Sequence, residues 1–75
     1  MTLFDILKDI FHIKAEEFKD EQSILALEEF DSMNHMLLVT KLEEEFNVEL
    51  TGDEIIGIRT IRDIKQILAQ KGVNP

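Results

Sequence analysis

Apolar residues recur three to four positions apart in several short stretches, and this spacing constrains the fold more than any other feature. The first stretch, which we expect to fade near Ile13, has its apolar face formed by Leu3, Phe4, Leu7, Ile10 and Phe11. A second stretch has an inward stripe of Leu38, Val39, Leu42 and Phe46, and the last has Ile61, Ile64, Ile67 and Leu68. No segment reads convincingly as a strand, so we predict an all-α chain.

Capping residues mark where these helices begin. Three Thr-x-x-acid pairs form candidate capping boxes: Thr2 with Asp5, Thr51 with Glu54, and Thr60 with Asp63. The longest helix is expected to begin at Asp31 or Ser32, since both residue types serve as N-caps. Gly57 is expected to end a short third helix, and Gly72 and Pro75 to end the last one. The sequence therefore predicts a small four-helix bundle with three longer helices and one short third helix.

The connecting segments carry fewer signals. Residues 14–30 are expected to be irregular or partly helical, and their apolar residues are expected to fold back onto the core: Ile24, Leu25, Leu27 and Phe30. After the longest helix, a short extended link is expected to bury Val48 and Leu50.

Length, charge and cysteine content limit the class of protein. Seventy-five residues form one small domain, 1–75, with little room for a deep catalytic pocket. The net charge of −8 is concentrated in residues 16–50, where eleven acids face two lysines. Such a surface repels nucleic acid and anionic membranes and attracts basic protein surfaces. Without cysteines, a signal peptide or a membrane-spanning run, we expect a cytoplasmic protein with no membrane insertion.

Three kinds of site can be set aside on sequence grounds. Asp31, Ser32 and His35 are the residue types of a hydrolase triad, but no nucleophile elbow or glycine loop accompanies them. His12 and Glu16 stand four positions apart, yet two ligands do not make a metal site. A helix-turn-helix would need a basic recognition helix, whereas the candidate helix ends in "EEEF".

Ser32 is then either a helix cap or an attachment point. Capping is the more frequent role of a serine at a helix start. Here, however, Met33 and Met36 are expected to point outward beside it, and exposed methionines suit a surface that packs against several partners. These neighbours favour the attachment point.

Three segments resemble the acyl carrier protein family: "DSM" at 31–33, "LLVTKLEEEFNVEL" at 37–50 and "TIRDI" at 60–64. The resemblance runs without gaps from Asp31 to Leu68 and implies a free-standing four-helix bundle of acyl-carrier type. It implies that Ser32 carries 4′-phosphopantetheine, transferred from coenzyme A by a phosphopantetheinyl transferase. Acyl or related groups would be held on this arm as thioesters and presented to partner enzymes, so the protein would be a carrier and not itself an enzyme.

The resemblance also assigns roles around Ser32. It implies a partner-binding surface of Asp31, Met33, Met36, Leu37, Glu43 and Glu44, and a lining for the acyl chain of Leu42, Phe46 and Ile58. The expected partners are the transferase and acyl-loading ligase or synthase enzymes with basic surfaces. We expect a monomer with no metal site.

Five positions depart from the pattern of fatty-acid carriers: Glu29, Asn34, Leu37, Lys41 and Ile56. They make the recognition helix less acidic and more apolar, which predicts a specialised carrier in a dedicated lipid or secondary-metabolite pathway. The alternative is an acidic helical protein-interaction domain with the same fold but no prosthetic group, in which Ser32 is only an N-cap.

Overall fold

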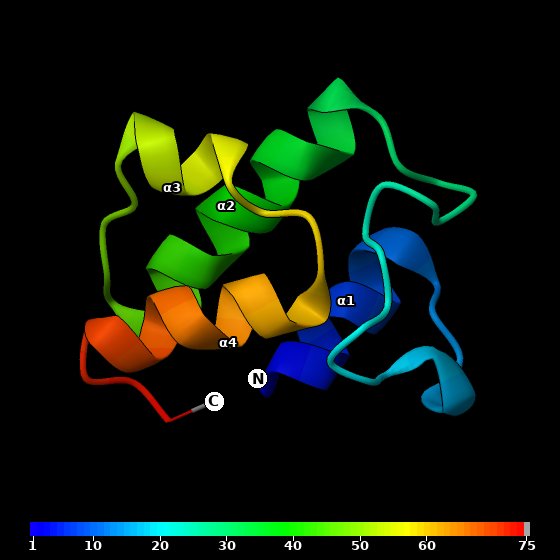
Figure 1. Cartoon of the computed structure of the whole chain (residues 1–75), viewed down its shortest axis with the longest axis horizontal. Helices are drawn as coiled ribbons and strands as arrows, with labels where there is room; N and C mark the ends of the chain where they lie inside the picture. Colours follow the sequence, from blue (N-terminus) through cyan, green and yellow to red (C-terminus); the bar gives the residue numbers. More distant parts are fainter. Residues whose placement is uncertain (75) are drawn as a thin grey trace.

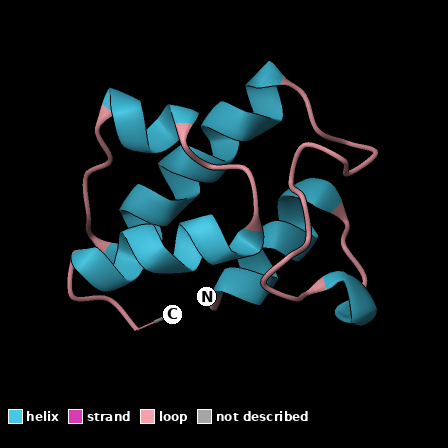
Figure 2. Cartoon of the chain, in the orientation of Figure 1, coloured by secondary structure: helices cyan, strands magenta, loops and turns pink. Residues whose placement is uncertain are grey.

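A computed structural model describes residues 1–74 and confirms the all-α prediction. Its four α-helices are α1 (Leu3–Phe11), α2 (Ser32–Phe46), α3 (Gly52–Ile56) and α4 (Ile61–Gln70), and one 3₁₀ turn, η1, spans Ala15–Glu17 (Figure 1). Within 1–74 no strand forms (Figure 2). The nearest approach to one is an isolated antiparallel bridge between Ser23 and Thr60. No helix among these residues is long and apolar enough to cross a membrane.

The capping residues start the helices as predicted. All three Thr-x-x-acid pairs form reciprocal capping boxes at the starts of α1, α3 and α4. At α2 the cap is Asp31, whose carboxylate accepts the Asn34 backbone N–H at 2.7 Å. Ser32 is therefore the first residue of the helix and not its N-cap.

Two helices end at residues other than glycine. α1 ends at Phe11, because His12 adopts the left-handed conformation with φ 55°, and α2 ends where Asn47 does the same with φ 53°. α3 ends at Gly57 as predicted, in right-handed geometry with φ −76°. The predicted role of Gly72, with φ 82°, also holds, while Pro75 lies outside the described residues.

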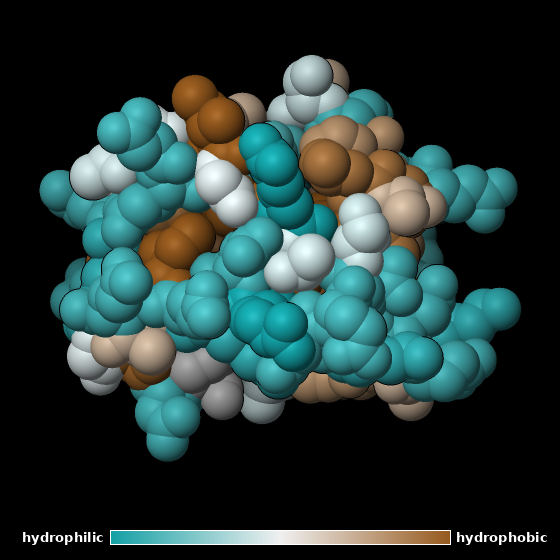
Figure 3. All heavy atoms as spheres, viewed as in Figure 1, coloured by the Kyte–Doolittle hydropathy of each residue, from teal (hydrophilic) through white to brown (hydrophobic). Residues whose placement is uncertain are grey.

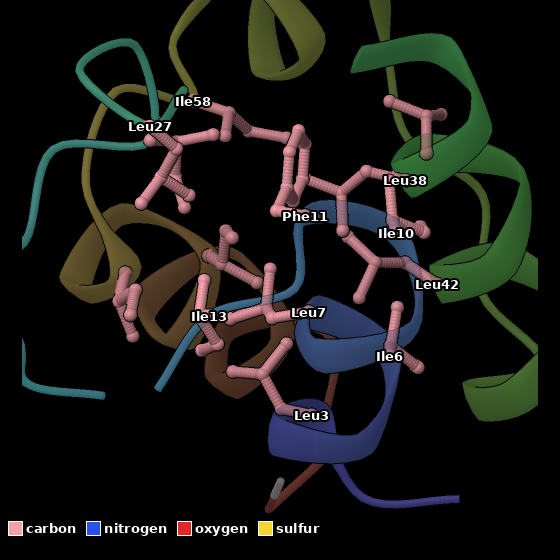
Figure 4. Packing of buried hydrophobic residues seen from close by; sticks show 14 of the residues in the cluster. Leu3, Ile6, Leu7, Ile10, Phe11, Ile13, Leu27, Leu38, Leu42 and Ile58 are labelled. Carbon is pink, nitrogen blue, oxygen red and sulfur yellow. The ribbon is translucent and has the colours of Figure 1, made fainter. Parts of the chain in front are cut away.

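The core lies between α1, α2 and α4. Ile6 and Ile10 of α1 face Leu42 of α2 in the close view (Figure 4), and α1 packs along α2. The predicted stripes are largely confirmed, with these residues buried: Leu3, Leu7, Ile10, Phe11, Leu38, Val39, Leu42, Ile61, Ile64 and Leu68. Phe4, Phe46, Val48, Leu50 and Ile67 are only partly buried at its edge.

The loop between α1 and α2 is fastened to the start of α4. Ile24 N–H donates to Arg59 O at 2.8 Å, and Lys65 Nζ lies 2.7 Å from Asp20 Oδ1. The hydrogen bond from Lys65 holds the pKa of Asp20 below its ordinary value.

The apolar residues of that loop fold back onto the core with one exception. Ile24 and Leu27 are buried and Phe30 is half-buried, as predicted. Leu25 was expected to be buried and is 49% exposed. This part of the loop has no helical or strand period, so the spacing of its apolar residues does not determine which of them face inward.

Candidate functional site

Ser32 lies exposed on the first turn of α2, between exposed Asp31 and Met33. Because Asp31 provides the N-terminal cap, the hydroxyl of Ser32 is not needed to satisfy the helix backbone. The helix dipole makes this end of a 15-residue helix partly positive. The serine is thus accessible and stands where a negatively charged group is favoured.

The segment leading into Ser32 is braced through Glu29. His12 Nδ1 lies 2.7 Å from Glu29 Oε2, and the Asn34 side-chain amide donates to Glu29 O at 2.8 Å. These two bonds tie the loop to the end of α1 on one side and to the first turn of α2 on the other. Sequence reasoning missed this brace, because Asn34 and His12 stand five and seventeen positions from Glu29, which lies in irregular structure.

The residue types of the hydrolase triad do not form a triad. The Asp31 carboxylate accepts from Asn34 N–H. The His35 ring is turned towards α3, with Nε2 3.1 Å from Ile55 O. Since a carbonyl oxygen only accepts, His35 Nε2–H is the donor, and within residues 1–74 no side-chain hydrogen bond joins His35 to Ser32 or to Asp31.

The apolar residues predicted for the partner surface are exposed together. Met33 is 79% exposed, and Met36 and Leu37 on the following turn are also exposed. Ile56 on α3, 72% exposed, adds to them. Figure 3 shows apolar atoms at the surface in the region of α3 and of the first turns of α2, in separate areas with hydrophilic atoms between them. We call these four residues the apolar face.

The two glutamates predicted for the same surface differ in exposure and in hydrogen bonding. Glu44 is exposed, whereas Glu43 is half-buried and its Oε2 accepts the Leu50 backbone N–H at 2.9 Å. Glu43 therefore connects α2 to the link that follows it. A partner contact by either glutamate stays a prediction.

The residues predicted to line an acyl chain do not surround an open cavity. Leu42 and Ile58 are fully buried, and Phe46 is half-buried. Two shallow hollows occur elsewhere. One, of about 180 Å³, lies beside His12 and Glu29. The other, of about 190 Å³, lies beside Phe4 and Phe18. A chain that reached Leu42 or Ile58 would have to separate packed helices.

Metal-ligand types do not cluster within residues 1–74, where no three His, Cys, Asp or Glu side chains gather to hold an ion. His12 pairs with Glu29 and not with Glu16, the residue considered with it in the sequence.

Comparison with protein families gives a match that includes Ser32. The family described as a phosphopantetheine attachment site matches residues 2–68, nearly the whole chain.

Individual relatives of this chain are named as acyl carrier proteins. An acyl carrier protein of Wolinella succinogenes is 32% identical over 68 residues, which cover 85% of this chain and 90% of the relative. One of Bdellovibrio bacteriovorus is 28% identical, with 91% of this chain and 87% of the relative covered. A solved structure of a candidate acyl carrier protein from Mycobacterium tuberculosis superposes with a TM-score of 0.81, at 22% identity and 92% coverage of both chains. This last likeness concerns the fold.

Proposed function

The chain belongs to the acyl carrier protein family, whose members are carriers with a 4′-phosphopantetheine group and not enzymes, and we propose that Ser32 bears that group here. One observation carries this proposal: Asp31 caps α2 and leaves the Ser32 hydroxyl exposed at the first helical position. When bound, the group supplies a thiol, a function that this cysteine-free chain lacks.

The residues around Ser32 fit such a group. Attachment through a phosphodiester places a negative charge at the N-terminal end of α2, where the helix dipole stabilises it. Exposed neighbours on both sides leave room for it. The brace through Glu29 holds the preceding backbone in place, so that the serine is presented in one orientation to a transferase.

The test is the intact mass of the protein after incubation with coenzyme A and a phosphopantetheinyl transferase of broad specificity. We expect a gain of one phosphopantetheine, mapped to Ser32. The chain has only one other serine, Ser23, whose hydroxyl accepts the Ala26 N–H at 3.2 Å. Ser32→Ala should abolish the gain and Ser23→Ala should retain it. No gain in the wild type, under conditions that modify a control carrier, would overturn the proposal.

That negative result would favour the alternative, an acidic helical interaction domain without a prosthetic group. The structure weakens this alternative in one respect. Its stated role for Ser32 was that of an N-cap, and Asp31 has that role.

We further propose that the carrier serves a dedicated lipid or secondary-metabolite pathway. The support is the apolar face, which includes Leu37 and Ile56, two exposed positions where the resemblance leads us to expect acids. Partner enzymes that recognise it need apolar contact area together with basic groups for Asp31 and Glu44.

This second proposal can be tested with fatty-acid synthase enzymes. The phosphopantetheinylated protein should be elongated more slowly than a housekeeping carrier. The double variant Leu37→Glu/Ile56→Glu should narrow the gap. Asn34→Asp should not narrow it, because the side chain at position 34 does not belong to the apolar face and its amide donates to Glu29 O. Elongation of the wild type at the housekeeping rate would remove the proposal.

A further inference from the structure

α3 is the least anchored helix of the bundle. It has five residues, none of them fully buried, and a helix so short has no stability of its own. Two polar contacts tie it to other helices. Glu54 Oε1 lies 2.9 Å from Lys71 Nζ at the end of α4, and His35 Nε2–H donates to Ile55 O at 3.1 Å.

Packing of the His35 ring supports its hydrogen bond to Ile55 O. The ring is half-buried and lies tilted against Phe30, with centroids 5.7 Å apart. Phe30 in turn stacks on Phe11 of α1 at 6.5 Å. These ring contacts hold the imidazole beside the last turn of α3, where its N–H donates to Ile55 O, a carbonyl that also accepts the Ile58 backbone N–H at 3.3 Å. His35 thus joins α3 to α2 and, through the aromatic rings, to α1.

His35 also stands close to Ser32. The two residues are three positions apart in α2, a spacing that makes side chains neighbours on a helix surface. Any group carried on Ser32 therefore begins next to the bond that fastens α3.

The core behind this bond is closed. Leu38, Leu42 and Ile58 are each at most 1% exposed. The two hollows described above lie beside other residues, one at His12 and Glu29 and the other at Phe4 and Phe18. Apolar cargo can reach Leu42 and Ile58 only if packed helices separate, and a movement of α3 away from α2 breaks the His35–Ile55 bond.

We propose that His35 fastens α3 over the core and so biases this carrier towards short or polar acyl groups, which stay outside the bundle. The inference rests on the proposed attachment of the prosthetic group to Ser32. A longer apolar chain gains from burial but must first break the bond, whereas a short or polar group has little to gain from the core. His35 acts through the position of α3 and is a positioning residue.

The fastening is tested by amide hydrogen exchange in the unloaded full chain, read by NMR at Ile55 and Gly57, whose N–H groups donate within or into α3. In His35→Ala these amides should exchange about fivefold faster than in the wild type, the factor for one lost hydrogen bond of about 1 kcal/mol. His35→Gln, which keeps a side-chain N–H, should stay within about twofold of the wild type. Thr40→Ala, at an exposed position of α2 whose hydroxyl donates to Met36 O in the same helix, is the control and should leave α3 unchanged.

The bias in cargo is tested by loading Ser32 with acetyl- or octanoyl-phosphopantetheine from the matching coenzyme A thioesters. In the wild type, octanoyl should shift the methyl resonances of Leu42 and Ile58 little more than acetyl does. In His35→Ala the octanoyl shifts should grow severalfold, and His35→Gln should return them towards the wild type.

Two results overturn the inference. One is unchanged α3 exchange in His35→Ala. The other is an octanoyl effect on Leu42 and Ile58 that is equally large with and without His35. Failure of Ser32 to accept any group refutes the proposed function and with it the bias in cargo. The exchange result, which needs no modification, then still decides whether His35 fastens α3.

Discussion

Replacing Glu43 and Glu44 one at a time separates two glutamates that look equivalent in the sequence. Glu43→Ala removes the acceptor of the Leu50 N–H bond at 2.9 Å and leaves a half-buried amide without that partner. We estimate a loss of about 1 kcal/mol in the free energy of unfolding, after about 0.3 kcal/mol is offset by the higher helix propensity of alanine. Glu44→Ala, at an exposed position, should change stability by no more than that offset.

The assay is urea unfolding followed by far-UV circular dichroism, because the chain has neither tryptophan nor tyrosine for fluorescence. For a domain of this size, 1 kcal/mol corresponds to a midpoint shift of about 1 M urea, or roughly 4–8 °C in Tm. Glu43→Gln, which retains an acceptor, should recover part of the loss. Equal midpoints for Glu43→Ala and Glu44→Ala would refute the role assigned to Glu43 as a connection between α2 and the following link.

Three further outcomes are expected. Asp31→Ala should cost about 1 kcal/mol through the lost cap, while Asp31→Asn should keep most of the stability, so slower modification of the Asn variant would report on charge recognition. Hydrogen bonds in the fold lower the pKa values of three carboxyl groups, those of Asp5, Asp20 and Glu54. The stability that these groups contribute is therefore present at neutral pH and lost as the pH falls below about 4.5. Tm should drop between pH 7 and pH 3 as the three groups are protonated. Gly72→Ala should destabilise by about 1 kcal/mol because φ is 82°, whereas Gly52→Ala, in open space at the start of α3, should stabilise by roughly 0.5 kcal/mol in the same urea assay.

The helix starts could be predicted because their determinants are local. A threonine and an acid three positions apart satisfy each other's backbone within one turn, and the pairs at the three predicted helix starts, Thr2, Thr51 and Thr60, did so. The apolar stripes on α1, α2 and α4 could be predicted for a similar reason, since a regular period determines which residues face inward.

Predictions failed where the determinant lies between segments. Leu25 was misplaced because an irregular loop has no period that selects an inward face. The contacts of His35 with Ile55, of Glu29 with His12 and of Glu43 with Leu50 were missed because each joins different elements. Their partners are known only once the helices are placed in space.

The structure also changes what the departures from the family pattern mean. Asn34 and Glu29 form one unit, in which the Asn34 amide donates to Glu29 O and the Glu29 carboxylate meets His12. An acid at position 34 could not donate that bond, and a glycine at position 29 could not reach His12. These two residues are therefore explained by the support of the segment before Ser32.

Leu37 and Ile56 are different, because both are exposed large apolar side chains. Exposed apolar area of this kind is favourable only when something covers it. Of the five substituted positions, Leu37 and Ile56 are the two that expose a large apolar side chain to solvent, and these two support a dedicated partner. Recognition is therefore expected to depend on the shape and apolar area of that surface as well as on the acids beside it.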